Sequence, residues 1–192
     1  MGATQVFVDA NVVRSRTLRD WLFLLRNAGD MFSVCTTEDV IAEVVYTLRR
    51  EKPEAPGYLT RSVHDRIIEQ LDYRVEDYPA GAPGYRGSDP DDAHVHAAAV
   101  AAGVDIVLTA DKGFTDLSEE DRDGLPYEIY RPDEFFVLVD DSSPGTVRRV
   151  SGEQLEYWCA KNPSGGVNLP AAFDAADCPR FAERVRLRLQ QL

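Results

Sequence analysis

Four short apolar runs punctuate the first 130 residues of the chain. They are VFVDAN (residues 6–11), MFSVC (31–35), VDIVLTAD (104–111) and YEIY (127–130), and such runs are typical of buried strands. Segments with the apolar period of an amphipathic helix separate them. The resulting alternation of strands and helices predicts an α/β sandwich with a mostly parallel sheet.

The helical segments have recognisable ends. Thr36 is expected to be the N-cap of a helix that ends before Pro53, and Gly103 is placed to close another. Pro and Gly are frequent in residues 78–90, which are expected to form a loop. The predicted helices of this region cover residues 15–30, 37–52, 59–71 and 90–102.

The character of the chain changes after Pro132, where no further strand is predicted. DEFFVLVDD favours a helix, SPGTVRR is expected to break it from a second helix over GEQLEYWCAK, and a last helix is predicted over residues 179–192. The tail is therefore helical and has no obvious partner in a sheet.

Composition restricts the class of protein. The 192 residues suit one domain with an appendage, and a hydrophobic content of 44% suffices for a real core. Three cysteines without CxxC spacing, and no run resembling a signal peptide, indicate a reduced, cytoplasmic protein. No apolar run approaches the roughly 20 residues that span a bilayer, so no membrane association is expected.

Charge argues against a nucleic-acid partner without excluding one. The formal net charge is −12, whereas phosphate contacts dominate nucleic-acid affinity. A bound cation would neutralise several of the acids, and the basic residues cluster locally. Four arginines in the last helix, for example, face RNA, an acidic partner or only water: Arg180, Arg184, Arg186 and Arg188.

Two of the predicted strands end in a carboxylate, Asp9 and Asp111. Ligands of open α/β sheets bind beyond the carboxyl ends of the strands. Two acids delivered to that edge repel each other unless a cation offsets their charge. The sequence therefore predicts a metal site there, although Asp111 is also suited to cap a turn between strand and helix.

Other acids are candidates for the same site, each with a structural alternative. Glu43 flanks the apolar face of its helix, where it points toward Asp9 or is a solvated surface residue. Asp92 falls in the first turn of a helix with Asp89 as N-cap. Helix capping is favoured for Asp89 and Asp91, whereas Asp92 suits capping and metal binding about equally. Asp116 contacts the same ion or caps a short helix.

Carboxylates without nearby Cys or paired His favour Mg²⁺ or Mn²⁺ over zinc. The histidines form no metal-binding motif. His96 lies one turn after Asp92 on the same face of the helix, within reach of the site, whereas His94 is expected to point elsewhere. A surface or core role is favoured for each of them.

These motifs, taken in order, resemble those of PIN-domain ribonucleases. The resemblance lies in VFVDANV, the acid of VIAEVVYTL, DPDDAHVHAAA and IVLTADKGF, and it covers roughly residues 4–140. The tail, with DEFFVLVDDSSPGTVRR and QLEYW, is similar to the helical extension of a long branch of VapC toxins from bacterial toxin–antitoxin pairs. Residues 54–87 carry no motif of the family.

The resemblance implies a three-layer α/β/α sandwich in residues 1–140 and a helical extension in residues 141–192. It assigns the metal-binding and catalytic acids to Asp9, Glu43, Asp92 and Asp111, with Asp116 as an additional ligand. The implied reaction is Mg²⁺- or Mn²⁺-dependent hydrolysis of RNA phosphodiester bonds. Candidate RNA contacts are Asn11, Arg14, Arg16 and Arg19, although Asn11 equally suits the orientation of Asp9 and the arginines a solvated helix face.

The family also implies partners. Its toxins are silenced by an antitoxin protein whose C-terminal segment lies over the acidic cleft, and they form homodimers. Trp21, Leu22 and Leu25 are candidates for the antitoxin's docking surface, with a role in the core favoured for all three.

Some alternative functions are compatible with the same fold, and one would require a different kind of α/β protein. A housekeeping RNA-processing nuclease, or a structure-specific DNA nuclease, has the same motifs, and an adjacent antitoxin gene would distinguish the toxin. A catalytically silent binding module would lead us to expect a damaged acid set, whereas all four positions hold acids. A phosphotransfer protein would require a nucleophilic Asp in a DxD or DxxxT context, which DAN does not provide.

Overall fold

The computed structural model describes residues 3–79, 84–85, 87 and 92–192. The chain divides into two compact units, each described separately below. Unit 1 comprises residues 1–14 and 31–131, and unit 2 comprises residues 15–30 and 132–192. The predicted division after residue 140 stays a prediction, since compactness alone does not delimit independently folding domains.

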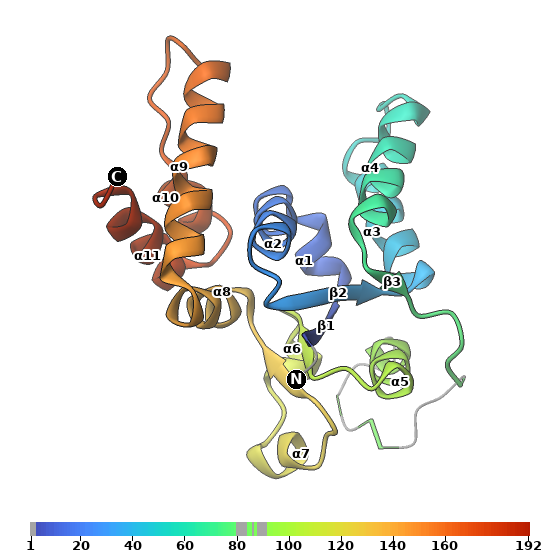
Figure 1. Cartoon of the computed structure of the whole chain (residues 1–192). Coiled ribbons are helices and arrows are strands. Elements are labelled where there is room, and N and C mark those ends of the chain that lie inside the picture. Colours follow the sequence, from blue (N-terminus) through green and yellow to red (C-terminus); the bar gives the residue numbers. More distant parts are fainter. Residues whose placement is uncertain (1–2, 80–83, 86, 88–91) are drawn as a thin grey trace. The chain divides into compact units, whose positions relative to one another are not determined.

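Unit 1 contains a five-stranded sheet in the order β3-β2-β1-β4-β5, in which every neighbouring pair is parallel. Helices surround the sheet, which confirms the predicted α/β class (Figure 1). Its strands are β1 (Thr4–Val8), β2 (Phe32–Thr36), β3 (Tyr73–Arg74), β4 (Ile106–Leu108) and β5 (Glu128–Tyr130). Its helices are α1 (Ala10–Arg14), α3 (Glu38–Glu51), α4 (Gly57–Gln70), α5 (Ala93–Ala102), α6 (Lys112–Thr115) and α7 (Glu119–Asp123).

The central strands are built from fully buried apolar residues, such as Phe7 of β1 and Leu108 of β4. A strand that is buried on both faces consists almost entirely of apolar residues, which is why these strands can be recognised in the sequence. In the sheet, β2 and β3 lie on one side of β1, and β4 and β5 lie on its other side. The strand order therefore reverses between β1 and β4, the place where ligands of open parallel sheets bind.

Local signals set the helix ends in unit 1. Thr37, with an extended backbone, is the N-cap of α3, and its hydroxyl accepts a hydrogen bond from Val40 N at 3.2 Å. The expected cap, Thr36, instead ends β2 and donates from its hydroxyl to Val8 O at 2.7 Å. Gly103 closes α5 in the left-handed region at φ 63°, as expected.

Unit 2 is entirely helical. It consists of α2 (Arg16–Gly29), α8 (Pro132–Ser142), α9 (Pro144–Lys161), α10 (Leu169–Asp174) and α11 (Pro179–Leu189), so the helical C-terminal extension is present. The predicted break between two helices is present at Ser143, but the second helix begins at Pro144, earlier than expected, and includes the rest of SPGTVRR. Pro144 occupies the first turn of α9, where a missing N–H costs nothing, and the helix then runs unbroken.

Aromatic side chains form the core of unit 2. Trp21 of α2 contacts Phe173 and Phe181 edge to face, at ring-centroid distances of 4.9 and 5.9 Å. Leu22 and Leu25 are fully buried and Trp21 is nearly so. The three residues are therefore core residues and present no docking surface, as the favoured interpretation held.

The four arginines of α11 do not form an open basic face. Arg188 binds the fully buried Asp140 through two hydrogen bonds of 2.7 and 2.8 Å, and Arg184 contacts Asp140 and Asp141. Arg186 pairs with Glu183 on the same helix. Three of the four arginines are thus paired with acids of the same unit, an outcome outside the alternatives of RNA, an acidic partner or water.

No helix in the described part of the chain combines the length and apolar character that a bilayer crossing requires.

Candidate active site

The site forms where the strand order reverses. Asp9 follows β1 directly, and its backbone N–H donates to Leu108 O, the last residue of β4, at 3.1 Å. Thr109 and Asp111 come immediately after β4. Parallel neighbours end at the same edge of a sheet, so the residues that follow the two strands meet there, as the sequence predicts.

A network of hydrogen bonds fixes the buried carboxylate of Asp9. Its Oδ2 accepts from Asn11 Nδ2 and from Thr109 Oγ1, both at 2.6 Å, and its Oδ1 accepts from Ala10 N at 2.6 Å. The amide oxygen of Asn11 accepts from Ala110 N at 2.9 Å. Asn11 therefore orients Asp9 and joins the ends of the two strands, which confirms the orienting alternative.

Glu43 belongs to a row of residues on one face of α3. Tyr46, Thr47 and Arg50 lie three, four and seven positions after it, and all four side chains line the same cavity as Asp9. Residues at this spacing share one face of a helix. Their helical spacing from Glu43 is the sequence signal that identifies Tyr46 and Arg50 as site residues.

Asp111 serves two purposes. It is the N-cap of α6, where its Oδ1 accepts from Gly113 N at 2.7 Å, and it also lines the cavity. Its own N–H donates to Thr109 Oγ1 at 2.9 Å. The capping and site alternatives are thus compatible, because the cap leaves the second carboxylate oxygen for other contacts.

Asp92 stands at the N-cap position of α5, one residue before the helix and not in its first turn. Tyr85 donates from its hydroxyl to Asp92 Oδ2 at 3.2 Å. Asp89 and Asp91, the alternative capping residues, lie outside the described residues. The carboxylate of Asp92 faces the cavity together with those of the other three predicted acids.

The cavity that these residues share has a volume of about 570 Å³. Four acids line it, delivered by β1, α3, α5 and the turn after β4. The remaining lining residues are Ala10, Asn11, Arg14, Val44, Tyr46, Thr47, Arg50, His94 and Val95. The four carboxylates that the sequence singled out are therefore brought together.

Burial, and then the crowding of acids, raises the pKa of two carboxyl groups in the site. Burial raises the pKa of Asp9 above its ordinary value of 3.8, against the hydrogen bonds from Thr109 and Ala10, and the charge of Asp111 adds to the rise. Partial burial also raises the pKa of Glu43, followed by repulsion from Asp9 and Asp111. Both carboxyl groups are thus harder to ionise in the metal-free site than in water.

This perturbation predicts how the metal-free protein responds to pH. A carboxylate with a raised pKa in the folded state contributes stability below its unfolded pKa, and loses it as pH rises through the folded pKa. The free energy of unfolding of the wild type, minus that of Asp9→Asn, should therefore fall as pH rises above about 4. Urea unfolding in EDTA between pH 4.5 and 8, followed by far-UV circular dichroism, measures this difference. A difference that is constant or increases with pH would contradict the raised pKa.

The donor set suits a hard divalent cation, because every acid in the cavity offers oxygen ligands. In the described residues, however, no three His, Cys, Asp or Glu side chains stand close enough to hold one ion together. A bound cation would have to draw the carboxylates closer to one another. Such an ion would offset both the burial and the repulsion between acids that raise the pKa of Asp9 and Glu43.

Comparison with known protein families identifies the scaffold. Residues 4–113, more than half of the chain, match the sequence model of the PIN domain. The chain belongs to the PIN domain family. PIN domains are usually nucleases, so nuclease chemistry and a nucleic-acid substrate are indicated. A search of curated proteins found no sequence that matches the chain.

One predicted ligand of the PIN site lies elsewhere. Asp116 is at the C-cap of α6, accepts from Thr115 Oγ1 at 3.3 Å, and lies 3.9 Å from Arg131 Nη2. It is mostly exposed and does not line the acidic cavity. Its helix-capping alternative fits this placement better than a place among the ligands.

The three arginines predicted to contact RNA separate in the structure. Arg14 lines the acidic cavity and pairs with Glu51 at 2.7 Å. Arg16 and Arg19 belong to unit 2, where both contact Asp20. Arg50, which the sequence did not suggest, lies in the cavity with its guanidinium over the ring of Tyr46, 5.7 Å from the centroid.

The structure contradicts the direction expected for His94 and confirms the core role favoured for His96. His94 lines the cavity, and its charge opposes the rise in the pKa of Asp9 and Glu43. His96 is buried, and its Nδ1 lies 2.6 Å from the hydroxyl of Tyr127. The expectation relied on helical spacing from Asp92, but α5 begins at Ala93, so that spacing does not apply.

Proposed function

We propose that this PIN protein is a Mg²⁺- or Mn²⁺-dependent endoribonuclease that acts as the VapC-type toxin of a toxin–antitoxin pair. The observation that carries the proposal is the convergence of Asp9, Glu43, Asp92 and Asp111 on one cavity at the reversal of strand order. A catalytically silent binding module would have no need to hold four acids against their mutual repulsion.

In this proposal the four acids hold the divalent ion. When bound, the ion supplies charge neutralisation and Lewis-acid activation of water for attack at phosphorus. Asn11 and Thr109 keep Asp9 in one orientation through the hydrogen bonds described above. Arg50 would contact an RNA phosphate, since it lines the cavity, is exposed, and has its guanidinium over the ring of Tyr46.

Gly113 tests the placement of Asp92. A Cβ at this position would overlap Asp92 Oδ2 and lie 3.2 Å from Asp111 Oδ1. Gly113→Ala should therefore displace the carboxylate of Asp92 and weaken Mn²⁺ binding about tenfold, at the lower end of what disturbed ligand shells cost. Isothermal titration calorimetry measures the affinity. Gly145→Ala is the matched control, because a Cβ there meets no atom within 4 Å. Equal affinities for the two variants would show that Asp92 does not contribute.

The toxin role rests on the resemblance of the motifs and of the helical extension. An antitoxin segment that presents Arg or Lys to the acidic cavity would offset the same repulsion that a cation offsets. A homodimer is part of the proposal on the same ground. The three cysteines are free thiols, which suits the reducing cytoplasm that we propose as the protein's location.

The proposal is tested by incubating the purified protein with structured RNA and with DNA of the same sequence, in Mg²⁺, in Mn²⁺ and in EDTA. Metal-dependent cleavage of RNA alone is the expected result. Cleavage of DNA would favour the structure-specific DNA nuclease. The toxin role is tested separately by induced expression, which should arrest growth, and growth should resume when a small protein encoded by the adjacent gene is co-expressed.

A further inference from the structure

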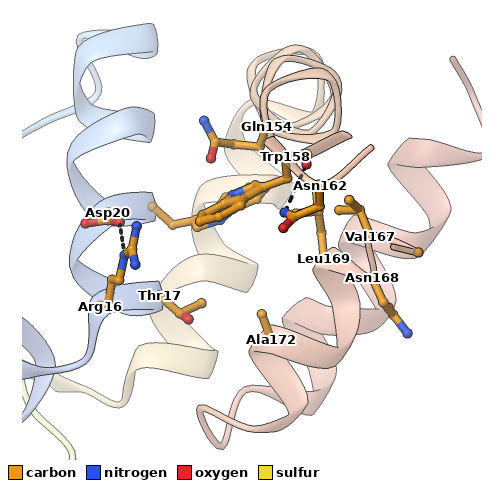
Figure 2. Close-up of a pocket in the computed structure, with 12 residues that line it drawn as sticks. Arg16, Thr17, Asp20, Gln154, Trp158, Asn162, Val167, Asn168, Leu169 and Ala172 are labelled. Atoms are coloured by element: carbon orange, nitrogen blue, oxygen red, sulfur yellow. Dashed lines mark hydrogen bonds and ion pairs between the residues drawn. The ribbon is translucent and has the colours of Figure 1, made fainter. Parts of the chain in front are cut away.

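Unit 2 contains a second cavity, of about 330 Å³, which the proposed chemistry does not use. Its walls come from α2, α9, the segment that leads into α10, and α10 itself. Figure 2 shows the indole of Trp158 in the middle, with Arg16 and Asp20 of α2 on one side and Asn162 and Leu169 on the other. Its volume is at the lower end of the range for small-ligand sites, about 300–1,000 Å³.

The cavity combines a flat aromatic wall with a cation and carboxamides. The guanidinium of Arg16 lies over the Trp158 ring, 5.4 Å from its centroid. Gln154, Asn162 and Asn168 also line the cavity. Asn162 donates from Nδ2 to Trp158 O and Asn168 accepts at Oδ1 from Ala171 N, so the other polar atom of each carboxamide remains for a ligand. A planar ring with hydrogen-bonding groups along its edge is the ligand that such a wall accommodates, because the ring stacks while the edge meets the amides.

The pairing of Arg16 with Asp20 favours a nucleobase over a phosphate as the ligand of this cavity. Arg16 Nε lies 3.5 Å from Asp20 Oδ2, so an acid in the same cavity already opposes its charge. A phosphate would be repelled by Asp20. A nucleobase would not be, since its exocyclic amine could donate to that carboxylate.

A second pair of the same kind adjoins the cavity on α9. Tyr157 is 45% exposed, contacts Trp158 edge to face at 5.3 Å, and has Lys161 Nζ 5.1 Å from its ring centroid. Alternating aromatic and cationic side chains on one surface are typical of platforms for single-stranded nucleic acid.

The charge distribution also points to unit 2. It carries ten Arg and Lys against eleven Asp and Glu, whereas unit 1 carries eleven against twenty-two. Nearly all of the net negative charge of the chain thus belongs to the unit with the acidic site. A polyanion such as RNA meets the weaker repulsion at unit 2.

We propose that the cavity around Trp158 binds a nucleobase of single-stranded RNA, with the base stacked in the space beside Trp158 and Arg16. The inference rests on the proposed function, in that this RNA would be the substrate of the nuclease. It adds a binding site in the helical extension, outside the PIN domain match.

The test is the affinity of a fluorescent single-stranded RNA decamer, measured by anisotropy in EDTA so that no metal-dependent cleavage occurs. Trp158→Ala should weaken binding about tenfold, within the range for loss of one stacked base, and Trp158→Phe should restore most of it. Arg16→Gln should weaken binding about threefold. The matched controls are Tyr58→Ala, an exposed tyrosine of α4, and Arg26→Gln, which removes the same charge from α2.

Unchanged affinity in both Trp158→Ala and Arg16→Gln would overturn the inference, and so would a wild type that binds no RNA. If Trp158→Ala fails to fold, the comparison of Arg16→Gln with Arg26→Gln decides. Cleavage in Mg²⁺ is assayed separately. Binding through Trp158 without any cleavage would overturn the nuclease and leave this site, whereas cleavage with binding independent of Trp158 would overturn this site alone.

Discussion

Replacing Asp9 by Asn is expected to slow RNA cleavage by about 100-fold or more. Asp9 is 5% exposed, is held by three hydrogen bonds of 2.6 Å, and faces the cavity with three other acids. A metal ligand in such a site supports several kcal/mol of transition-state stabilisation, and about 1.4 kcal/mol corresponds to each tenfold in rate. The rate of cleavage of an end-labelled RNA under single-turnover conditions measures the loss.

The control for this prediction is Asp65→Asn. Asp65 is half-exposed on α4, outside the acidic cavity, and its contacts with His64 and Arg61 are those of a surface ion pair. Its replacement should leave the cleavage rate within about twofold of wild type, since such pairs contribute little. If Asp9→Asn cuts as fast as this control, the acidic cavity is not the catalytic site.

Replacing Asp140 by Asn is expected to cost unit 2 about 3 kcal/mol of unfolding free energy. Asp140 is fully buried and accepts two hydrogen bonds from Arg188, whose side chain is only 17% exposed. Removing one partner of a buried ion pair leaves the other charge uncompensated, and that is the costly change. Both tryptophans of the chain lie in unit 2, so their fluorescence during urea unfolding reports on this unit.

Asp141→Asn is the matched control for Asp140→Asn. Asp141 neighbours Asp140 on α8 and contacts Arg184 at 2.9 Å, but it is 55% exposed. Water screens this pair, so its loss should cost less than about 1 kcal/mol. Similar losses in the two variants would mean that burial of the Asp140 carboxylate does not determine its contribution.

The acids that follow the strands could be predicted as site residues from the sequence, because the end of a parallel strand also marks the edge of the sheet where ligands bind. A buried parallel strand reads as an apolar run, and the residue that follows it is delivered to the carboxyl edge of the sheet. Asp9 and Asp111 follow this logic directly. Glu43 needed the helical period as well, and the same period would have revealed Tyr46 and Arg50 on its face.

Features that depend on tertiary contacts could not be predicted from the sequence. Thr36 and Thr37 are equally good N-caps by residue type, and Thr36 was excluded because its hydroxyl bonds to β1. Pro144 reads as a break but starts a long helix. Arg16 follows Arg14 by two positions, yet it belongs to a different unit, which no local pattern records.

The most direct test of the account is the rate of RNA cleavage measured in parallel with Mn²⁺ occupancy. Binding is followed by isothermal titration calorimetry, and cleavage is assayed at the same metal concentrations. The account predicts that the rate rises with occupancy, and that Asp111→Asn lowers the Mn²⁺ affinity and the rate together. Full cleavage in EDTA, or no cleavage of tRNA or ribosomal RNA by folded, Mn²⁺-saturated protein, would contradict it.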